Sequence, residues 1–249
     1  SLLLAALTGC GAANTASSSG SASSSTSVST SSNSAKKHTS FFVKDNGDGT
    51  KVIKDIDGKE VTVPTNPERI ADLWHANNQV VLLLGGAEKL VSTTTAVKSL
   101  AWFKQVYPGI EKVDAPVKGT DVNMEQLLAD KPEVLLASSK DQISKATEAG
   151  IPAVHVEFQN FADLKRTVEL TAEVIGTDEA IERAEKYLAY LEKNENLIKE
   201  RLQGVTESPK VLHIAGGSDL TKVDGSNSLI GEWMKLSGAK NSLDGVENL

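Results

Sequence analysis

Several predicted strands are followed directly by aromatic or polar side chains that could hold a ligand. Trp74 and His75 come after the first strand, where an aromatic face beside an imidazole suits a large planar or chelated ligand. The residues at the ends of the later strands are Thr94, Thr95, Ser138, Ser139, Lys140, Gly217, Ser218 and Asp219. Because open α/β sheets bind ligands beyond the carboxyl ends of their strands, these positions predict a binding cleft. Trp102, on the helix after the second strand, is a further candidate, although core packing explains it equally well.

Two other kinds of chemistry find less support in the sequence. His75, His155 and His213 could be three ligands of a bare Zn²⁺ or Mn²⁺ ion, but His155 and His213 lie inside apolar runs. A closed metal site also needs a carboxylate or a fourth ligand at a matching place, which the sequence does not show. The sequence also lacks four motifs that are typical of enzymes: a nucleophile elbow, a Walker loop, a dinucleotide-binding fingerprint and a zinc-protease helix. We therefore expect no direct metal site, no cofactor and no catalytic activity.

The elements that would position these residues alternate between strand and helix. A hairpin is predicted over residues 51–64, with its turn at Asp57-Gly58. Strands are then predicted at residues 69–74, 89–93, 133–137 and 153–157, and helices at residues 77–84, 99–107, 122–130 and 143–149. This alternation with short connections predicts a parallel sheet covered by helices, and therefore an α/β fold.

Two consecutive helices and the opening of a second lobe are predicted next. A helix over residues 161–175 stops at Gly176, and a second runs from Thr177 to about Gln203, or about 39 Å. Since its apolar positions do not sustain a heptad, we interpret it as a rigid spacer rather than a coiled coil. A strand at 211–215, a turn at 216–219 and a helix at 229–236 follow. One strand and one helix cannot bury both faces of a sheet, so we expect this second lobe to be incomplete here.

The first forty residues have a different character. Residues 2–7 are an apolar run that is too short to span a bilayer and ends at Leu7-Thr8-Gly9-Cys10. This sequence resembles the bacterial lipoprotein box, in which the cysteine is acylated. We interpret residues 1–10 as the remnant of a signal peptide, with Cys10 as the lipid anchor. Residues 11–40, rich in Ser and Thr, are predicted to be a solvated tether. The expected domains are therefore residues 41–160, 161–203 and 204–249.

Composition narrows the range of partners. The chain has 249 residues, of which 26 are Lys or Arg and 33 are Asp or Glu, giving a formal net charge of −7. Because basic residues are not clustered, nucleic acid is an unsuitable partner. Cys10 is the only cysteine, so an internal disulfide and a cysteine-based metal site are excluded.

Three segments resemble one protein family when they are taken in order. The first consists of residues 58–64 (GKEVTVP) and 67–70 (PERI). The second consists of residues 121–125 (DVNME), Leu127-Leu128 and residues 131–134 (KPEV), and the third of residues 226–231 (SNSLIG) and 238–241 (GAKN). They resemble the solute-binding lipoproteins that serve ABC importers of iron-siderophore, haem and cobalamin. The resemblance implies two Rossmann-like α/β lobes joined by a single long helix, with the ligand in the cleft between them. One departure is Glu133, where Asp is commoner in the family.

The resemblance also implies a ligand and partners. We expect a monomer that is lipid-anchored on the outer face of the cell membrane and delivers an iron-siderophore-type chelate to an ABC permease with a cytoplasmic ATPase. Glu232 and Glu111 are the candidate carboxylates for docking on the permease. None of the four arginines is predicted at the carboxyl end of a strand, which favours a neutral or cationic chelate, such as a hydroxamate complex, or a corrinoid. A haem or cobalamin binder, a direct Zn²⁺ or Mn²⁺ binder, and a surface adhesin without a transport role remain alternatives.

Overall fold

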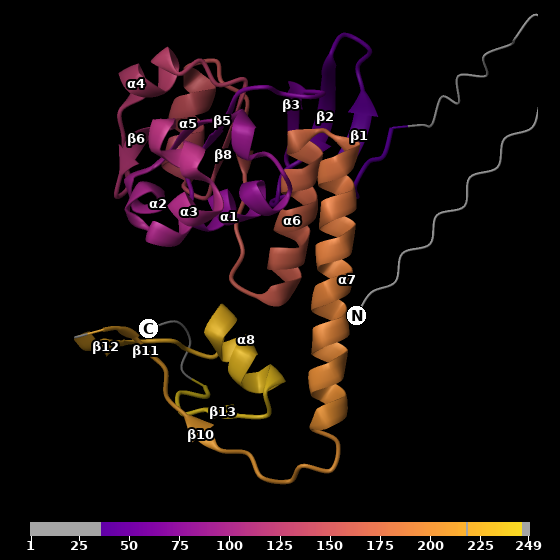
Figure 1. The fold of residues 1–249 in the computed structure, drawn as a ribbon, viewed down its shortest axis with the longest axis vertical. Coiled ribbons are helices and arrows are strands. Elements are labelled where there is room, and N and C mark those ends of the chain that lie inside the picture. Colours follow the sequence, from indigo (N-terminus) through magenta and orange to yellow (C-terminus); the bar gives the residue numbers. More distant parts are fainter. Residues whose placement is uncertain (1–35, 218, 246–249) are drawn as a thin grey trace, which may run out of the picture. The chain divides into compact units, whose positions relative to one another are not determined.

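The computed structural model describes residues 36–217 and 219–245 (Figure 1). The predicted signal remnant with Cys10, most of the predicted tether and Ser218 lie outside these residues. In the part of the chain that the structure describes, no helix is both long and apolar enough to cross a bilayer.

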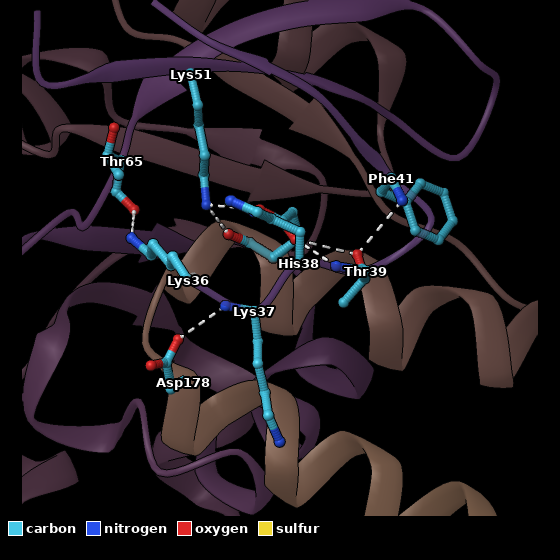
Figure 2. A network of polar contacts seen from close by, with 9 residues as sticks. Lys36, Lys37, His38, Thr39, Phe41, Lys51, Thr65 and Asp178 are labelled. Atoms are coloured by element: carbon cyan, nitrogen blue, oxygen red, sulfur yellow. Dashed lines mark hydrogen bonds and ion pairs between the residues drawn. The ribbon is translucent and has the colours of Figure 1, made fainter. Parts of the chain in front are cut away.

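The end of the predicted tether is a correction to the sequence analysis. Residues 36–40 lie against two helices, α6 (Phe161–Ile175) and α7 (Asp178–Arg201). The N–H of Lys37 donates to Asp178 Oδ1 over 3.3 Å, and the N–H of Thr39 donates to Glu173 Oε2 over 2.7 Å. Figure 2 shows this segment against the helices. Since these backbone groups are bound to the folded part, the boundary at residue 40 was placed too late.

A small antiparallel sheet precedes the main one. It consists of β1 (Phe42–Asp45), β2 (Thr50–Lys54) and β3 (Glu60–Pro64) in that order. The predicted hairpin is confirmed, because β2 pairs with β3 in antiparallel register and Gly58 has φ of 85° at the turn. The strand β1 was not predicted, although the residues that join it to β2, Asn46-Gly47-Asp48-Gly49, carry the same kind of turn signal.

The main sheet has the strand order β7-β6-β5-β4-β8-β9 and is parallel except for the pair β6 and β7. Its strands are β4 (Ile70–Asp72), β5 (Leu90–Thr94), β6 (Asp114–Lys118), β7 (Asp121–Val122), β8 (Val134–Ala137) and β9 (Ala153–His155). The four predicted strands are confirmed as β4, β5, β8 and β9. The strands β6 and β7 were missed because Pro116 interrupts one of them and the other has two residues.

Helices cover both faces of the main sheet (Figure 1). They are α1 (His75–Leu83), α2 (Thr95–Ser99), α3 (Ala101–Val106), α4 (Met124–Ala129) and α5 (Lys140–Glu148), with 3₁₀ turns at Ala87–Lys89 and Pro108–Lys112. Alternate residues of β8 enter two separate hydrophobic clusters: Val134 and Leu136 enter one, and Leu135 and Ala137 enter the other. The helix predicted at 99–107 is confirmed as α3, whereas α2, which ends at Ser99 just before it, was not predicted.

Two helices lie side by side after the main sheet (Figure 1). Gly176, with φ of 78°, ends α6, and the hydroxyl of Thr177 accepts the N–H of Ala180 to begin α7. With 24 residues, α7 is about 36 Å long. The predicted spacer helix is therefore confirmed, and it ends two residues earlier than expected.

The opening of the second lobe differs from its prediction. The expected strand 211–215 is divided into β10 (Lys210–Val211), which pairs with β13 (Lys240–Asn241), and β11 (Ile214–Gly216), which pairs with β12 (Asp219–Val223). Because β11 and β12 are antiparallel, the turn after Gly216 joins two strands of a hairpin and does not lead from a strand into a helix. The predicted helix is confirmed as α8 (Leu229–Leu236), and it lies in the chain between the parallel strands β10 and β13.

Candidate functional site

The carboxyl ends of β4, β5 and β8 meet at a pocket of about 300 Å³. Its lining residues are Leu73, Trp74, His75, Thr94, Thr95, Ala96, Gly119, Thr120, Ser138, Ser139 and Gln142. Six of the residues predicted from strand ends are in this set: Trp74, His75, Thr94, Thr95, Ser138 and Ser139. The parallel sheet brings them together because its neighbouring strands end at the same edge.

Helices begin at the pocket directly after each of these strands. The hydroxyl of Thr94 accepts the N–H of Val97 over 3.2 Å at the start of α2. The hydroxyl of Ser139 accepts the N–H of Gln142 over 3.5 Å at the start of α5. Trp74 precedes α1 in an extended conformation. The pocket therefore faces the positive ends of these helices, where the first N–H groups have no partner within the helix.

A buried polar network supports the loop that carries Trp74. Asp72 is fully buried, and its carboxyl group accepts the N–H of Trp74 over 3.1 Å and the Asn77 amide over 2.9 Å. The Asn78 amide donates to the backbone carbonyl of Asp72 over 2.9 Å and accepts the hydroxyl of Thr93 over 2.7 Å. Burial raises the pKa of Asp72 well above its usual range, because only neutral donors face the carboxyl group.

An aromatic pair lies beside the pocket. Trp74 is half-buried, and its ring centroid lies 4.8 Å from that of Phe158. Phe158 was not predicted, although it follows β9 and the rule that identified the other strand-end residues applies to it. Phe158 also lines a separate apolar pocket with α1, α6 and α7 residues. The pair offers aromatic surface at the edge of the polar pocket.

His155 connects the hairpin turn with the pocket. The imidazole is 3 % exposed, with Nδ1 2.9 Å from Asp57 Oδ2 and Nε2 3.2 Å from the carbonyl oxygen of Ser138. Both partners are hydrogen-bond acceptors. The bond from His155 lowers the pKa of Asp57. The contact between His155 and the carbonyl oxygen of Ser138 holds the Ser138 loop next to β9.

The three histidines do not form a metal site in the described residues. His155 is occupied as above, His213 has Nδ1 2.5 Å from Asp224 Oδ2, and His75 is exposed at the pocket. Within residues 36–217 and 219–245, no group of three or more His, Cys, Asp or Glu side chains is arranged to hold a metal ion.

Other predicted ligand residues lie away from this pocket. Lys140 extends into solvent, with its side chain 79 % exposed and Nζ 3.6 Å from Asp57. Trp102 is 37 % exposed and stacks on Phe103 at 3.7 Å between ring centroids. Gly217 and Asp219 lie at the β11–β12 turn, where the Asp219 carboxylate accepts the N–H and the hydroxyl of Thr221. The structure therefore does not bring these four residues to the pocket.

The two candidate docking carboxylates have different surroundings. Glu111 is exposed, and its carboxylate lies 2.8 Å from Lys104 Nζ. Glu232, on α8, is half-buried and accepts the N–H of Phe161 at the start of α6 over 2.5 Å. It also lines a larger pocket of about 660 Å³ together with charged side chains of both signs, among them Asp57, Arg166 and Lys235.

Five residues of the pocket were missed by sequence reasoning: Leu73 and Ala96, which adjoin predicted residues, and Gly119, Thr120 and Gln142. Gly119 and Thr120 join β6 to β7, so the failure to predict these strands hid them. Gln142 lies in the first turn of α5, whereas the predicted helix began at Ile143. The cap signal at Ser139 could have identified this turn.

Known proteins are similar to this chain in sequence and in fold. A model of the periplasmic binding protein family matches residues 70–245. The ABC transporter substrate-binding lipoprotein YvrC of Bacillus subtilis is 24% identical over 200 residues, covering 76% of this chain and 60% of that protein. The molybdate-binding protein MolA of Haemophilus influenzae is 24% identical over 216 residues, covering 77% of this chain and 60% of that protein.

Solved structures give the same picture of the fold. A periplasmic solute-binding protein from Veillonella parvula superposes with a TM-score of 0.67 at 23% identity, covering 80% of this chain and 62% of that chain. Molybdate-bound MolA also has a TM-score of 0.67, at 22% identity, covering 79% of this chain and 67% of that chain. The chain spans about 60% of the length of the curated relatives it matches.

Proposed function

Because this chain belongs to the periplasmic binding protein family, we propose that it captures an iron-siderophore-type chelate for an ABC importer. The relative YvrC is described as an ABC transporter substrate-binding lipoprotein, which supports the class of function. The proposed role is binding and delivery without a catalytic step.

One observation carries this proposal. Residues from the ends of three strands, Trp74, Thr94 and Ser138 among them, line one pocket at the edge of the sheet. The half-buried Trp74 and Phe158 offer aromatic surface beside this pocket, and the hydroxyl groups offer donors. A ligand with apolar or aromatic surface around polar oxygens matches both features, as the chelating groups of siderophores do.

The cellular setting is part of the same proposal. We place the protein on the outer face of the cell membrane as a monomer, held by acyl chains on Cys10. A permease with a cytoplasmic ATPase would receive the ligand, and Glu111 and Glu232 are the proposed docking carboxylates. Since Glu232 already accepts an N–H of α6, docking through it would need that bond to be exchanged.

A tryptophan-fluorescence titration of the full-length protein tests the proposal. The probes are ferric hydroxamates, ferric catecholates, haem, cobalamin, molybdate, and free Zn²⁺ or Mn²⁺. Saturable quenching by a ferric chelate that is lost in Trp74→Phe would support it. The matched controls are Trp102→Phe and Trp233→Phe, because these two side chains do not line the pocket and should leave the quenching intact.

The other outcomes separate the alternatives. Quenching by haem or cobalamin alone would retain the class of protein and replace the iron chelate. Quenching by molybdate alone would agree with the similarity to MolA and would replace the iron chelate with an oxyanion. A response to free Zn²⁺ or Mn²⁺ that is abolished by His75→Ala would indicate direct metal binding. A protein that responds to none of the probes would favour a surface adhesin.

A further inference from the structure

One residue that lines the pocket at the ends of β4, β5 and β8 carries a buried acceptor that has no hydrogen-bond partner among the described residues. Gln142 lines the pocket and is 4 % exposed. Its Nε2 donates to the carbonyl oxygen of Thr120 over 3.3 Å, whereas its Oε1 is buried and accepts no hydrogen bond. Buried acceptors in folded proteins are nearly always satisfied, so this atom calls for a donor that residues 36–217 and 219–245 do not supply.

Two capping hydroxyl groups of the pocket are free to act as donors. The Thr94 and Ser139 hydroxyls each accept a helix N–H, so each keeps its own hydrogen to donate. The helices α1 and α5, with nine residues each, begin at the pocket with their positive ends. Among the described residues that line the pocket there is no Asp, Glu, Lys or Arg, and His75 is the one histidine. Such surroundings favour a negatively charged group rich in oxygen.

We infer that this pocket holds an anionic, oxygen-rich arm of the ligand that also carries an N–H or O–H donor, which Gln142 Oε1 accepts. Gln142 is then a specificity-determining residue. The inference rests on the proposed function and deepens it by naming the class of ligand.

This assignment differs from the neutral or cationic chelate that the sequence favoured. That expectation took arginine as the signal of anion binding, and the arginines are indeed elsewhere. Arg69 bonds the carbonyl oxygens of Asp130 and Lys131, and Arg183 bonds the Glu179 carboxylate over 2.8 Å. Helix N-termini and capping hydroxyls supply the same preference for negative charge without a cationic side chain.

A comparison of two ferric chelates with the full-length protein tests the sign of the charge. The ferric complex of a tris-catecholate with amide N–H groups is trianionic, whereas a ferric tris-hydroxamate is neutral. Isothermal titration should find the catecholate bound about tenfold more tightly or better. Tighter binding of the hydroxamate would overturn the inference, even though it would support the proposed function.

Two substitutions at one position test the role of Gln142. Gln142→Leu removes the acceptor at similar size, and should weaken the catecholate complex about tenfold. Gln142→Glu keeps an acceptor but adds a negative charge, so it should weaken that complex more than Gln142→Leu does. The control Gln105→Leu changes an exposed residue of α3 outside the pocket and should keep the wild-type affinity. Thermal unfolding checks that each variant is folded.

The outcomes distinguish this inference from the proposed function. Unchanged affinity in both Gln142 variants, or stronger binding by Gln142→Glu, overturns the inference whichever ligand is bound. Molybdate binding that Gln142→Glu weakens, without binding of either ferric chelate, would refute the iron chelate and support an anion pocket. Failure of the wild-type protein to bind any of these three probes would overturn both.

Discussion

Two buried carboxyl groups of this protein are stabilised in different ways. Glu173 on α6 is fully buried, and Lys51 Nζ, itself fully buried, lies 2.9 Å from its Oε1. His38 Nδ1 and the backbone N–H of Thr39 complete its surroundings (Figure 2). Asp72, beneath the pocket, is equally buried, but its carboxyl group contacts a backbone N–H and a side-chain amide.

The difference appears in the ionisation of the two groups. Burial alone would raise the pKa of Glu173, but attraction to Lys51 and the bonds from Thr39 and His38 hold it below its usual value. Burial raises the pKa of Asp72, since its neutral donors do not compensate for lost hydration. The Glu173 carboxylate therefore links α6 with β2 and with residues 38–39 as a charged group. The Asp72 carboxyl group instead positions the Trp74 loop through hydrogen bonds from neutral donors.

The largest effect is expected when the Glu173 network is broken. Glu173→Ala leaves the Lys51 ammonium buried without its partner, which should destabilise the protein by about 3–5 kcal/mol. Urea unfolding measures this loss. The double variant Lys51→Met with Glu173→Leu removes both charges, and should recover much of the stability because a buried ion pair can be replaced by apolar packing. If the double variant is no more stable than Glu173→Ala, the loss does not come from the unpaired charge.

The pH dependence of stability should have opposite signs at the two carboxyl groups. Between the ordinary Asp pKa of about 3.9 and the raised pKa of Asp72, the folded state binds more protons than the unfolded state, so stability falls as pH rises. Each unit of that difference corresponds to about 1.4 kcal/mol. Unfolding of Asp72→Asn and wild type across this range should show the variant gaining stability relative to wild type with rising pH.

At Glu173 the sign is reversed. The pKa of Glu173 is lowered in the folded state. Its contribution to the stability of the fold is therefore complete above the ordinary Glu pKa of about 4.3, and it is lost as pH falls through the folded-state pKa. On acidification, the wild type should therefore lose stability relative to the Lys51→Met, Glu173→Leu variant. A pH-independent difference for both carboxyl groups would show that neither ionisation is coupled to folding.

A smaller effect is expected from a single helix cap of the pocket. Ser139→Ala removes the hydroxyl that begins α5, and should cost about 1 kcal/mol of stability. It should also weaken ligand binding, because the same hydroxyl is a donor at the pocket. Asn123→Ala is the matched control, since Asn123 caps α4 in the same way outside the pocket lining. Equal ligand affinities in the two variants would contradict a role of Ser139 in binding.

Sequence reasoning found the strand-end residues better than the residues that support them. Trp74, Thr94 and Ser138 directly follow the predicted strands, so their common edge could be predicted. Gln142 was missed because the predicted helix began one residue later, at Ile143, and its contact with Thr120 depends on the irregular strands β6 and β7. The pairing of Lys51 with Glu173 joins residues 122 positions apart. Each of the two alone resembles a polar position on the outer face of an amphipathic strand or helix, so no local pattern could reveal their burial.

The smallest effect is expected at the rim of the Glu173 network. Lys37 Nζ lies 3.3 Å from Glu182 and 3.6 Å from Glu185, but these side chains are exposed to water. Such pairs contribute little, because water and salt screen them. Lys37→Ala should therefore leave the urea midpoint unchanged within error at moderate salt, since the backbone N–H of residue 37 still donates to Asp178. A large loss of stability in this variant would mean that charge on the surface, and not the buried pair, holds residues 36–40 against the helices.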